Sequence, residues 1–144
     1  MSETSTSTIA ISASADEVRA VLFDIANYPS WSTSFKTANV LVSDGQGRPT
    51  QVNLSVDAGA LKDKPTLNYD WSAYPDRVDF SLEDADLLTE MSGAYIVKDN
   101  GDETEVTFEL TVALSMPVPP TMRIKAEKTT IDLALKQLKE KLEN

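Results

Sequence analysis

The sequence contains no cysteine and no histidine among its 144 residues. The absence of cysteine excludes disulfides and thiol nucleophiles, and the two absences together remove the usual zinc ligands. Without histidine the chain also lacks the side chain most often used as a general base. No calcium-loop spacing is present either. A metal held by oxygen ligands remains possible, and any catalysis would use carboxylates, tyrosine, lysine or positioned water. We predict no metal site and no cofactor, and we assign no catalytic residue.

Basic residues and long apolar runs are also scarce. The chain has 13 basic and 23 acidic residues, a formal net charge of −10, so nucleic acid is a poor partner. No apolar run approaches the ~20 residues that span a bilayer. The first eight residues are polar and lack the basic-then-apolar order of a secretory signal, which favours a cytoplasmic location. The length and ordinary globular composition predict one domain over residues 1–144.

The first part of the chain predicts a strand followed by helix. Alternating β-branched residues indicate a strand over residues 3–13. Ser14 and Glu17 have the spacing of a capping box, which predicts a helix start. This helix should end near Asn27, because Pro29 disfavours helical geometry just before it. Residues 32–35 are expected to form a second short turn of helix.

Hydrophobic residues then alternate with a period of two, which is typical of half-buried strands. The alternating rows, given by their first and last apolar members, are Val40–Val42, Val52–Val56, Leu67–Trp71, Val78–Leu82, Met91–Val97 and Val106–Met116. Glycine-containing turns at 44–47 and 99–102 separate some of them. A proline-rich segment, 117–120, ends the last row, and a long helix is expected from Pro120 to Leu142.

This order of elements predicts an α+β fold, in which a curved antiparallel sheet of about seven strands packs against a long C-terminal helix. Two short helices follow the first strand. One helix about 10 Å across cannot cover a curled sheet of roughly 30 Å width. The sequence therefore predicts an apolar cavity between sheet and helix. A filled core is the alternative.

The segment from Ser14 to Trp31 resembles the START-like, or SRPBCC, superfamily, in particular its polyketide cyclase/dehydrase type. The resemblance is carried by Asp24, Tyr28, Pro29 and Trp31, and by the proline-rich exit before the terminal helix. It implies a helix-grip fold with a cavity for a lipid, sterol, quinone or polyketide. It implies no particular reaction, because the superfamily includes carriers, sensors and aromatase/cyclases.

Ring-bearing and apolar side chains expected to face the cavity form the predicted ligand-binding set. Its members are Trp31, Phe35, Tyr69, Trp71, Phe80, Tyr95, Phe108, Leu110, Ile131 and Leu135. The hydroxyl of Tyr69 or Tyr95 could orient a ligand carbonyl or hydroxyl. The alternative for these residues is ordinary core, and a one-residue slip in register would expose them. The Tyr28–Trp31 motif could line the mouth of the cavity. The alternative is a hydrophobic plug that fixes the first helices to the sheet.

Two charged segments have simple interpretations. Carboxylates between Glu83 and Glu90 are expected in a solvated loop rather than a metal or acid/base site. Arg123, Lys125 and Lys128, near the start of the last helix, could face an anionic head group or a membrane surface. The alternative is a solvated helix face against an acidic body.

The leading hypothesis is non-catalytic binding of a small hydrophobic molecule in an internal cavity, as carrier, sensor or sequestering protein. The alternative is a polyketide cyclase or dehydratase that acts mainly by positioning its substrate. A protein-interaction role through the sheet edge or the long helix ranks third. Transient membrane contact is compatible with the sequence, which does not indicate an oligomeric state.

Overall fold

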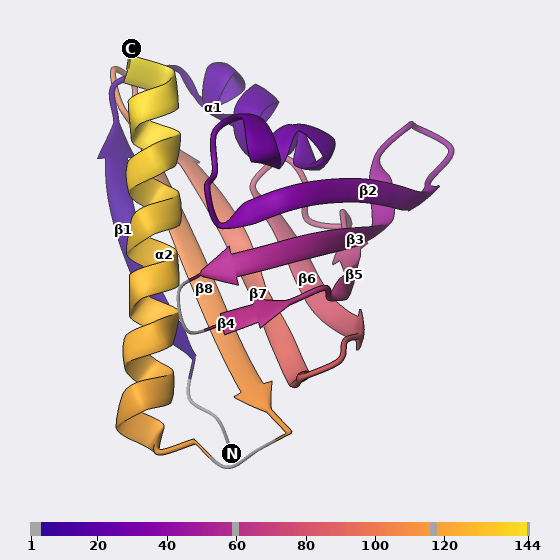
Figure 1. Ribbon diagram of the computed structural model, residues 1–144. Coiled ribbons are helices and arrows are strands. Elements are labelled where there is room, and N and C mark those ends of the chain that lie inside the picture. The colour runs from indigo at the N-terminus through magenta and orange to yellow at the C-terminus, as the bar shows by residue number, and fades with distance from the viewer. Residues whose placement is uncertain (1–3, 59–60, 116–117, 144) are drawn as a thin grey trace.

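The computed structural model describes residues 4–58, 61–115 and 118–143 (Figure 1). The fold is α+β, as the sequence predicts. Its elements in chain order are β1 (Ser5–Ile11), α1 (Ala15–Leu22), the 3₁₀ helix η1 (Ile25–Ser30), β2 (Phe35–Ser43), β3 (Pro49–Ala58), β4 (Leu61–Asp63), β5 (Thr66–Asp70), β6 (Arg77–Asp84), β7 (Leu88–Asp99), β8 (Thr104–Leu114) and α2 (Pro120–Glu143). The predicted strand and turn members at residue 3, Met116 and Pro117 lie outside the described residues.

All pairings in the sheet are antiparallel. The strand order is β1-β8-β7-β6-β5-β3-β2, and the short β4 pairs with β3 off this path. The described residues therefore form eight strands where the alternation predicts about seven, because a three-residue strand leaves no periodic signal. Figure 1 shows β2, β3 and β4 crossing in front of β6–β8, so the sheet curls strongly around its concave side.

The helical segment after β1 differs from the prediction in its second half. Ser14 caps α1, and its hydroxyl accepts the backbone N–H of Glu17 at 3.2 Å. The α-helix ends at Leu22, however, and a 3₁₀ helix that contains Pro29 takes the chain to Ser30. Proline fits there because its fixed φ suits a 3₁₀ turn. The predicted helical turn at 32–35 is wrong, since Phe35 already begins β2.

The terminal helix α2 lies along β1 and β8 at one side of the sheet (Figure 1). The face of α2 that packs on the sheet carries the buried side chains of Ile131, Leu135 and Leu138. One buried position on the same face is charged: Glu127, with 1% of its surface exposed. Its carboxylate accepts hydrogen bonds from the Ser5 hydroxyl and the Val112 backbone N–H, both at 2.7 Å.

The apolar rows of β3 and β5–β8 face the concave side of the sheet in the predicted register. The row Val40–Val42 is the exception, because β2 is an edge strand and these two side chains are 38% and 50% exposed. β5 and β6 place Tyr69 opposite Phe80, and β7 and β8 place Tyr95 opposite Phe108. Gly93 lies between these pairs, opposite both Phe80 and Leu110. A Cβ at Gly93 would lie 1.9 Å from the carbonyl oxygen of Glu109, so only glycine allows this close approach of β7 and β8.

Candidate ligand-binding site

Four of the predicted ligand-binding residues form a chain of aromatic rings across the concave side of the sheet. The ring centroids of Tyr69 and Phe80 lie 6.2 Å apart, and those of Phe80 and Tyr95 lie 5.8 Å apart. Tyr95 and Phe108 are closer still, at 4.5 Å. All four side chains are buried. The four rings come from β5, β6, β7 and β8, which are hydrogen-bonded to one another in that order. Strand pairing therefore fixes the relative positions of the rings.

A fifth ring, Tyr28 of η1, closes the aromatic chain from the helical side. Its centroid lies 5.5 Å from that of Phe35 and 6.4 Å from that of Tyr95. The Tyr28 hydroxyl donates a 2.6 Å hydrogen bond to the carbonyl oxygen of Leu22. Tyr28 is fully buried, so for this residue the contacts agree with a hydrophobic plug. Trp31 is only partly buried, and its ring packs edge-on against Tyr28 at 5.3 Å.

The buried tyrosine hydroxyls are held in their protonated form. Burial raises the pKa of Tyr28 well above its ordinary value, and the neighbouring Tyr95 and Tyr69 add to the rise. Burial also raises the pKa of Tyr69 and of Tyr95. At neutral pH these groups can therefore donate hydrogen bonds, but they cannot serve as phenolate bases.

The aliphatic members of the predicted set belong to the same core. Leu110 comes from β8, and Ile131 and Leu135 come from α2; each is at most 3% exposed. They belong to one hydrophobic cluster with the aromatic rings. The structure therefore brings together Phe35, Tyr69, Phe80, Tyr95, Phe108, Leu110, Ile131 and Leu135, with Trp31 at the cluster's edge.

Trp71 is buried in the same hydrophobic cluster, but its ring contacts lie at the border of the cluster. It follows β5 directly, and its ring packs against Phe23 and Tyr74, with centroids 5.9 and 5.5 Å away. Its indole N–H donates to the carbonyl oxygen of Pro49 at 2.6 Å. Trp71 forms part of the wall of a groove of about 510 Å³, which we call the α1–hairpin groove. Its lining is Arg19, Ala20, Phe23, Asp24, Ile25, Ala26, Val40, Ser43, Gly47, Arg48, Pro49, Trp71 and Tyr74.

Sequence reasoning missed most of this groove. Phe23, Arg48 and Tyr74 come from three separate segments: the end of α1, the β2–β3 turn and the loop after β5. Short-range periodicity relates residues within one element only, so nothing in the pattern joins these three. The glycine-containing turn at 44–47 was the one available signal, because it predicts the hairpin that carries Arg48.

Four hollows in the described part of the chain open to solvent, and none of them is the cavity between sheet and helix that the sequence predicts. One helix is narrower than the sheet, which is why the sequence predicts free space beside it. In the structure, aromatic side chains that contact one another lie in this space. Trp31 borders two of the surface hollows, and Tyr69 and Phe80 border a third, of about 210 Å³. A ligand between the sheet and α2 would therefore contact side chains that also contact one another.

Three polar groups near the aromatic cluster are buried without a hydrogen-bond partner in the described part of the chain. They are the hydroxyls of Ser32 and Ser34 and the indole Nε1 of Trp31. All three lie in the short connection from η1 into β2. An unpaired buried polar group costs free energy, so a guest molecule or water that supplied partners here would be stabilised.

The charged segments have structural roles or face solvent. Residues 83, 84, 86 and 90 are exposed acidic side chains, at the end of β6, in the turn and early in β7. Arg123 forms an ion pair with the buried Glu127 at 2.9 Å, and Lys128 donates to the carbonyl oxygen of Thr6. Two of the three basic residues at the start of α2 thus bond within the molecule.

A search of the residues described in the structure finds no group of three or more acidic side chains placed to hold a metal ion. Within those same residues, no helix combines the length and the apolar character needed to cross a bilayer.

Comparison with known proteins identifies the family. Residues 2–143 match the family described as polyketide cyclase/dehydrase and lipid transport. The chain belongs to this family. It is a START-like protein with a helix-grip fold, so the resemblance found in the Ser14–Trp31 segment is confirmed. No curated protein sequence matches the chain.

Several solved START-like structures share the fold over nearly the whole chain. A START superfamily protein from Mycobacterium smegmatis is 24% identical, with a TM-score of 0.89 and 97% of each chain covered. The Zhui aromatase/cyclase from Streptomyces sp. R1128 is 17% identical, with a TM-score of 0.79; 99% of this chain and 94% of that one are covered. Ginseng major latex-like protein 151 is 10% identical, with a TM-score of 0.73; 98% and 97% are covered.

Proposed function

We propose that this START-like protein binds a small hydrophobic molecule between the concave side of the sheet and α2, as a carrier, sensor or sequestering protein. The supporting observation is the run of buried aromatic rings from Tyr69 to Phe108, with tyrosine hydroxyls among them. The ligand would contact the cluster of Phe35, Tyr69, Phe80, Tyr95, Phe108, Leu110, Ile131 and Leu135, with Trp31 and Trp71 at its two borders. Lipids, quinones, sterols and polyketides all suit such walls.

The chemistry of the cluster favours binding over acid/base catalysis. The tyrosine hydroxyls stay protonated, so they can hold a carbonyl or hydroxyl of the ligand but cannot take its proton. Among the residues that the structure describes, the buried carboxylates are Asp63 and Glu127, and both already accept several hydrogen bonds from the protein. Neither is placed to serve a substrate.

The test of ligand binding is a thermal-shift and native mass spectrometry screen of the delipidated protein against lipids, quinones, sterols and polyketides. A ligand that binds only the folded state stabilises it by RT ln(1 + L/Kd), where L is the free ligand concentration, so the melting temperature rises with the logarithm of ligand concentration above Kd. We expect such a rise and a one-to-one complex within at least one class. The absence of both in every class would contradict the proposal.

The position of the site is tested by removing single hydroxyl groups. Tyr95→Phe and Tyr69→Phe keep the buried rings, and Tyr74→Phe removes a hydroxyl from a side chain that is 41% exposed. For a ligand that carries a carbonyl or hydroxyl, loss of one hydrogen bond should weaken binding about fivefold to tenfold. At least one buried variant should show this loss and Tyr74→Phe should not. Equal affinities in all three would place the ligand elsewhere.

A second candidate function, polyketide cyclisation, is favoured by the description of the family. A shaped pocket can direct cyclisation by positioning a reactive chain, without an added general base. The protein incubated with a poly-β-ketone would then change the ratio of cyclised products, and an unchanged product mixture would exclude this activity. A cytoplasmic location remains a prediction, which fractionation of the producing cells would test.

A further inference from the structure

The α1–hairpin groove is a second place where the chain could hold a small molecule, and it differs chemically from the interior. It lies between the α1–η1 segment, the β2–β3 hairpin and the loop that follows β5. Figure 1 shows the turn of the β2–β3 hairpin pointing away from α2. Its volume of about 510 Å³ falls within the range of small-molecule sites.

One wall of the groove is aromatic. Phe23, Trp71 and Tyr74 contact one another pairwise, with ring centroids between 5.5 and 5.9 Å apart. Tyr74 is 41% exposed, so part of this wall is open to solvent. An aromatic surface of this kind suits a flat ring system, which can stack on or pack edge-on against it.

Arg48 lies over this aromatic wall. Its guanidinium carbon is 5.8 Å from the centroid of the Trp71 ring and 5.4 Å from that of Tyr74. The Nε atom lies 3.3 Å from a carboxylate oxygen of Asp44, yet it is buried without a hydrogen-bond acceptor in the described residues. Both distances are those of a cation–π contact, and a guanidinium presents paired N–H donors to planar anionic groups.

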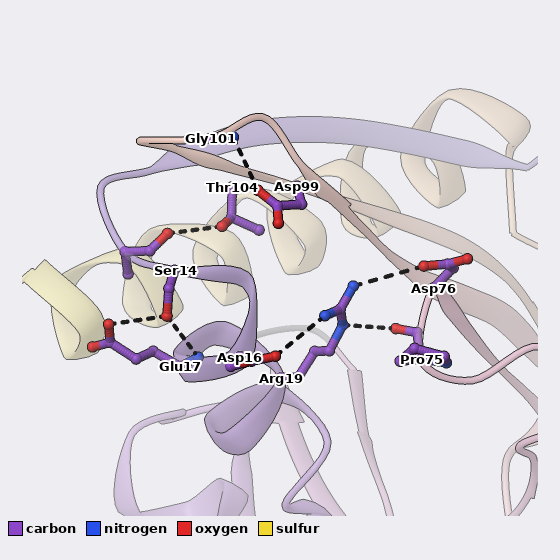
Figure 2. A network of polar contacts seen from close by, with 10 residues as sticks. Ser14, Asp16, Glu17, Arg19, Pro75, Asp76, Asp99, Gly101 and Thr104 are labelled. Carbon is purple, nitrogen blue, oxygen red and sulfur yellow. Dashed lines mark hydrogen bonds and ion pairs between the residues drawn. The ribbon is translucent and has the colours of Figure 1, made fainter.

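Arg19 contributes a second positive charge from α1, and its side chain is only 17% exposed. Figure 2 shows its guanidinium between Asp16 and Asp76, with its Nε donating to the carbonyl oxygen of Pro75 at 3.0 Å. The two carboxylates lie 3.6 and 3.7 Å away, and their side chains are 98% and 82% exposed. Such exposed ion pairs are weak, so a bound anion could compete with them.

Half of the arginines of this acidic chain line the groove. The protein has a net charge of −10 and four arginines, two of which, Arg19 and Arg48, belong to the lining. Asp24 also lines the groove, and Asp16, Asp44 and Asp76 pair with the two arginines at 3.3 to 3.7 Å. A bound anion therefore competes with these carboxylates for the guanidinium groups.

From the aromatic wall and the two arginines together, we propose that the α1–hairpin groove binds a flat, ring-bearing small molecule with one anionic group, such as an aromatic carboxylate or sulfonate. The ring system packs on Trp71 and Tyr74, and the anionic group binds at the guanidinium of Arg48 or Arg19. This site adjoins the proposed interior site at Trp71, but Arg19, Arg48 and Tyr74 belong to the groove alone, so it stands whether or not the interior takes a ligand.

The test compares two probes with the same ring system, anilinonaphthalene sulfonate and the uncharged phenylnaphthylamine. The chain has two tryptophans, so its N–H correlation spectrum contains two indole signals, which a Trp31→Phe spectrum assigns. We expect the sulfonate to shift the Trp71 indole signal in a saturable way and to bind at least about tenfold more tightly than the uncharged probe at this site.

Charge-neutral variants identify the anion-binding group. Arg48→Gln and Arg19→Gln should each lower the affinity for the sulfonate, by about tenfold for the arginine that contacts it, and leave the affinity for the uncharged probe unchanged. Arg77→Gln is the matched control, because Arg77 pairs with Asp79 and Glu109, outside the groove lining. Arg48→Lys keeps the charge but loses the planar stacking, and it should lie between wild type and Arg48→Gln.

Three results would overturn this inference. The first is sulfonate binding that leaves the Trp71 signal in place. The second is equal affinity for both probes at Trp71. The third is sulfonate affinity that is unchanged in both Arg48→Gln and Arg19→Gln, once circular dichroism shows that the variants are folded. A failure of the interior site would instead appear as a missing thermal shift with neutral lipids, so the two failures are distinguishable.

Discussion

At the scale of single residues, polar side chains stabilise the fold where backbone donors lack partners in the sheet. Asp63, the last residue of β4, accepts four backbone N–H groups: its own successor Lys64 at 2.7 Å, Leu87 and Leu88 at 2.9 Å, and Asp86 at 3.2 Å. One carboxylate thereby joins β4 to the turn between β6 and β7. Burial opposes its ionisation, but the backbone donors outweigh it and lower the pKa of Asp63 below its usual value.

Asp63→Asn should lower the free energy of unfolding by about 2 kcal/mol at neutral pH, because the amide nitrogen cannot accept hydrogen bonds. The folded-state pKa is depressed, so the stabilisation by Asp63 is complete above the unfolded pKa near 3.9 and disappears as the pH falls through the folded value. Urea unfolding at several pH values would show the difference between wild type and variant shrinking below about pH 4. The exposed Asp132→Asn provides the control, and a difference independent of pH would contradict this account.

Gly93 shows how a missing side chain determines packing. Gly93→Ala should destabilise the protein by about 3 kcal/mol or more, because the new Cβ would lie within 1.9 Å of the Glu109 carbonyl oxygen. Gly45→Ala is the matched control, since a Cβ there meets nothing within 4 Å. Denaturant titration of both variants measures the contrast. A loss below about 1 kcal/mol for Gly93→Ala would mean that β7 and β8 separate easily.

At the scale of elements, the contact between α2 and the sheet includes a charged group. β1 begins at Ser5, opposite Leu110, so the backbone N–H of Val112 lies beyond the end of this pairing. Glu127 reaches from α2 to accept that N–H, together with the Ser5 hydroxyl and a terminal nitrogen of Arg123. The carboxylate thus joins the start of α2 to β1 and β8.

Glu127→Ala should lower the free energy of unfolding by about 3 kcal/mol, because it removes the acceptor of the buried Val112 N–H and leaves a cavity. Glu127→Gln should cost less, since its amide oxygen still accepts one hydrogen bond. Glu140→Ala, an exposed position on the same helix, is the control and should change stability by under about 0.5 kcal/mol. Chemical denaturation compares the three. Equal stability of Glu127→Ala and wild type would show that the contact contributes nothing.

At the scale of the whole molecule, the net charge of −10 opposes compaction. The ion pairs at the surface, such as Arg77 with Asp79 and Lys139 with Glu143, are partly exposed and offset little of this repulsion. At 0.1 M ionic strength, salt screens interactions between exposed charges that lie more than about 10 Å apart. It therefore weakens the repulsion between acidic residues that are not in contact. The folded state should therefore gain from moderate salt.

Raising sodium chloride from about 20 to about 200 mM should increase the melting temperature by a few degrees, because the screening length falls below the spacing of the acidic side chains. Differential scanning calorimetry measures the change. Potassium chloride at the same concentrations should give the same shift, which separates screening from binding of a specific ion. A falling melting temperature would mean that the surface ion pairs stabilise the fold more than the net charge destabilises it.

The sequence by itself determined the secondary structure of most of the chain and the side of the sheet that is buried. Period-two rows identified β2, β3 and β5–β8, and the Ser14 cap identified the start of α1. These features depend on neighbours within one element, so local pattern suffices to predict them. The Tyr28–Trp31 motif added the family, and with it the helix-grip arrangement of α2.

Only the tertiary structure decided how the space inside the curled sheet is used. Whether the rings of Tyr28, Tyr95 and Phe108 stay apart around a hollow or meet depends on the curvature of the sheet and the position of η1, which no short pattern encodes. The same holds for the groove, because Arg48 and Trp71 meet only when a distant hairpin folds against the loop after β5. Packing between distant segments is set by the whole set of contacts at once, and local sequence patterns report on one element at a time.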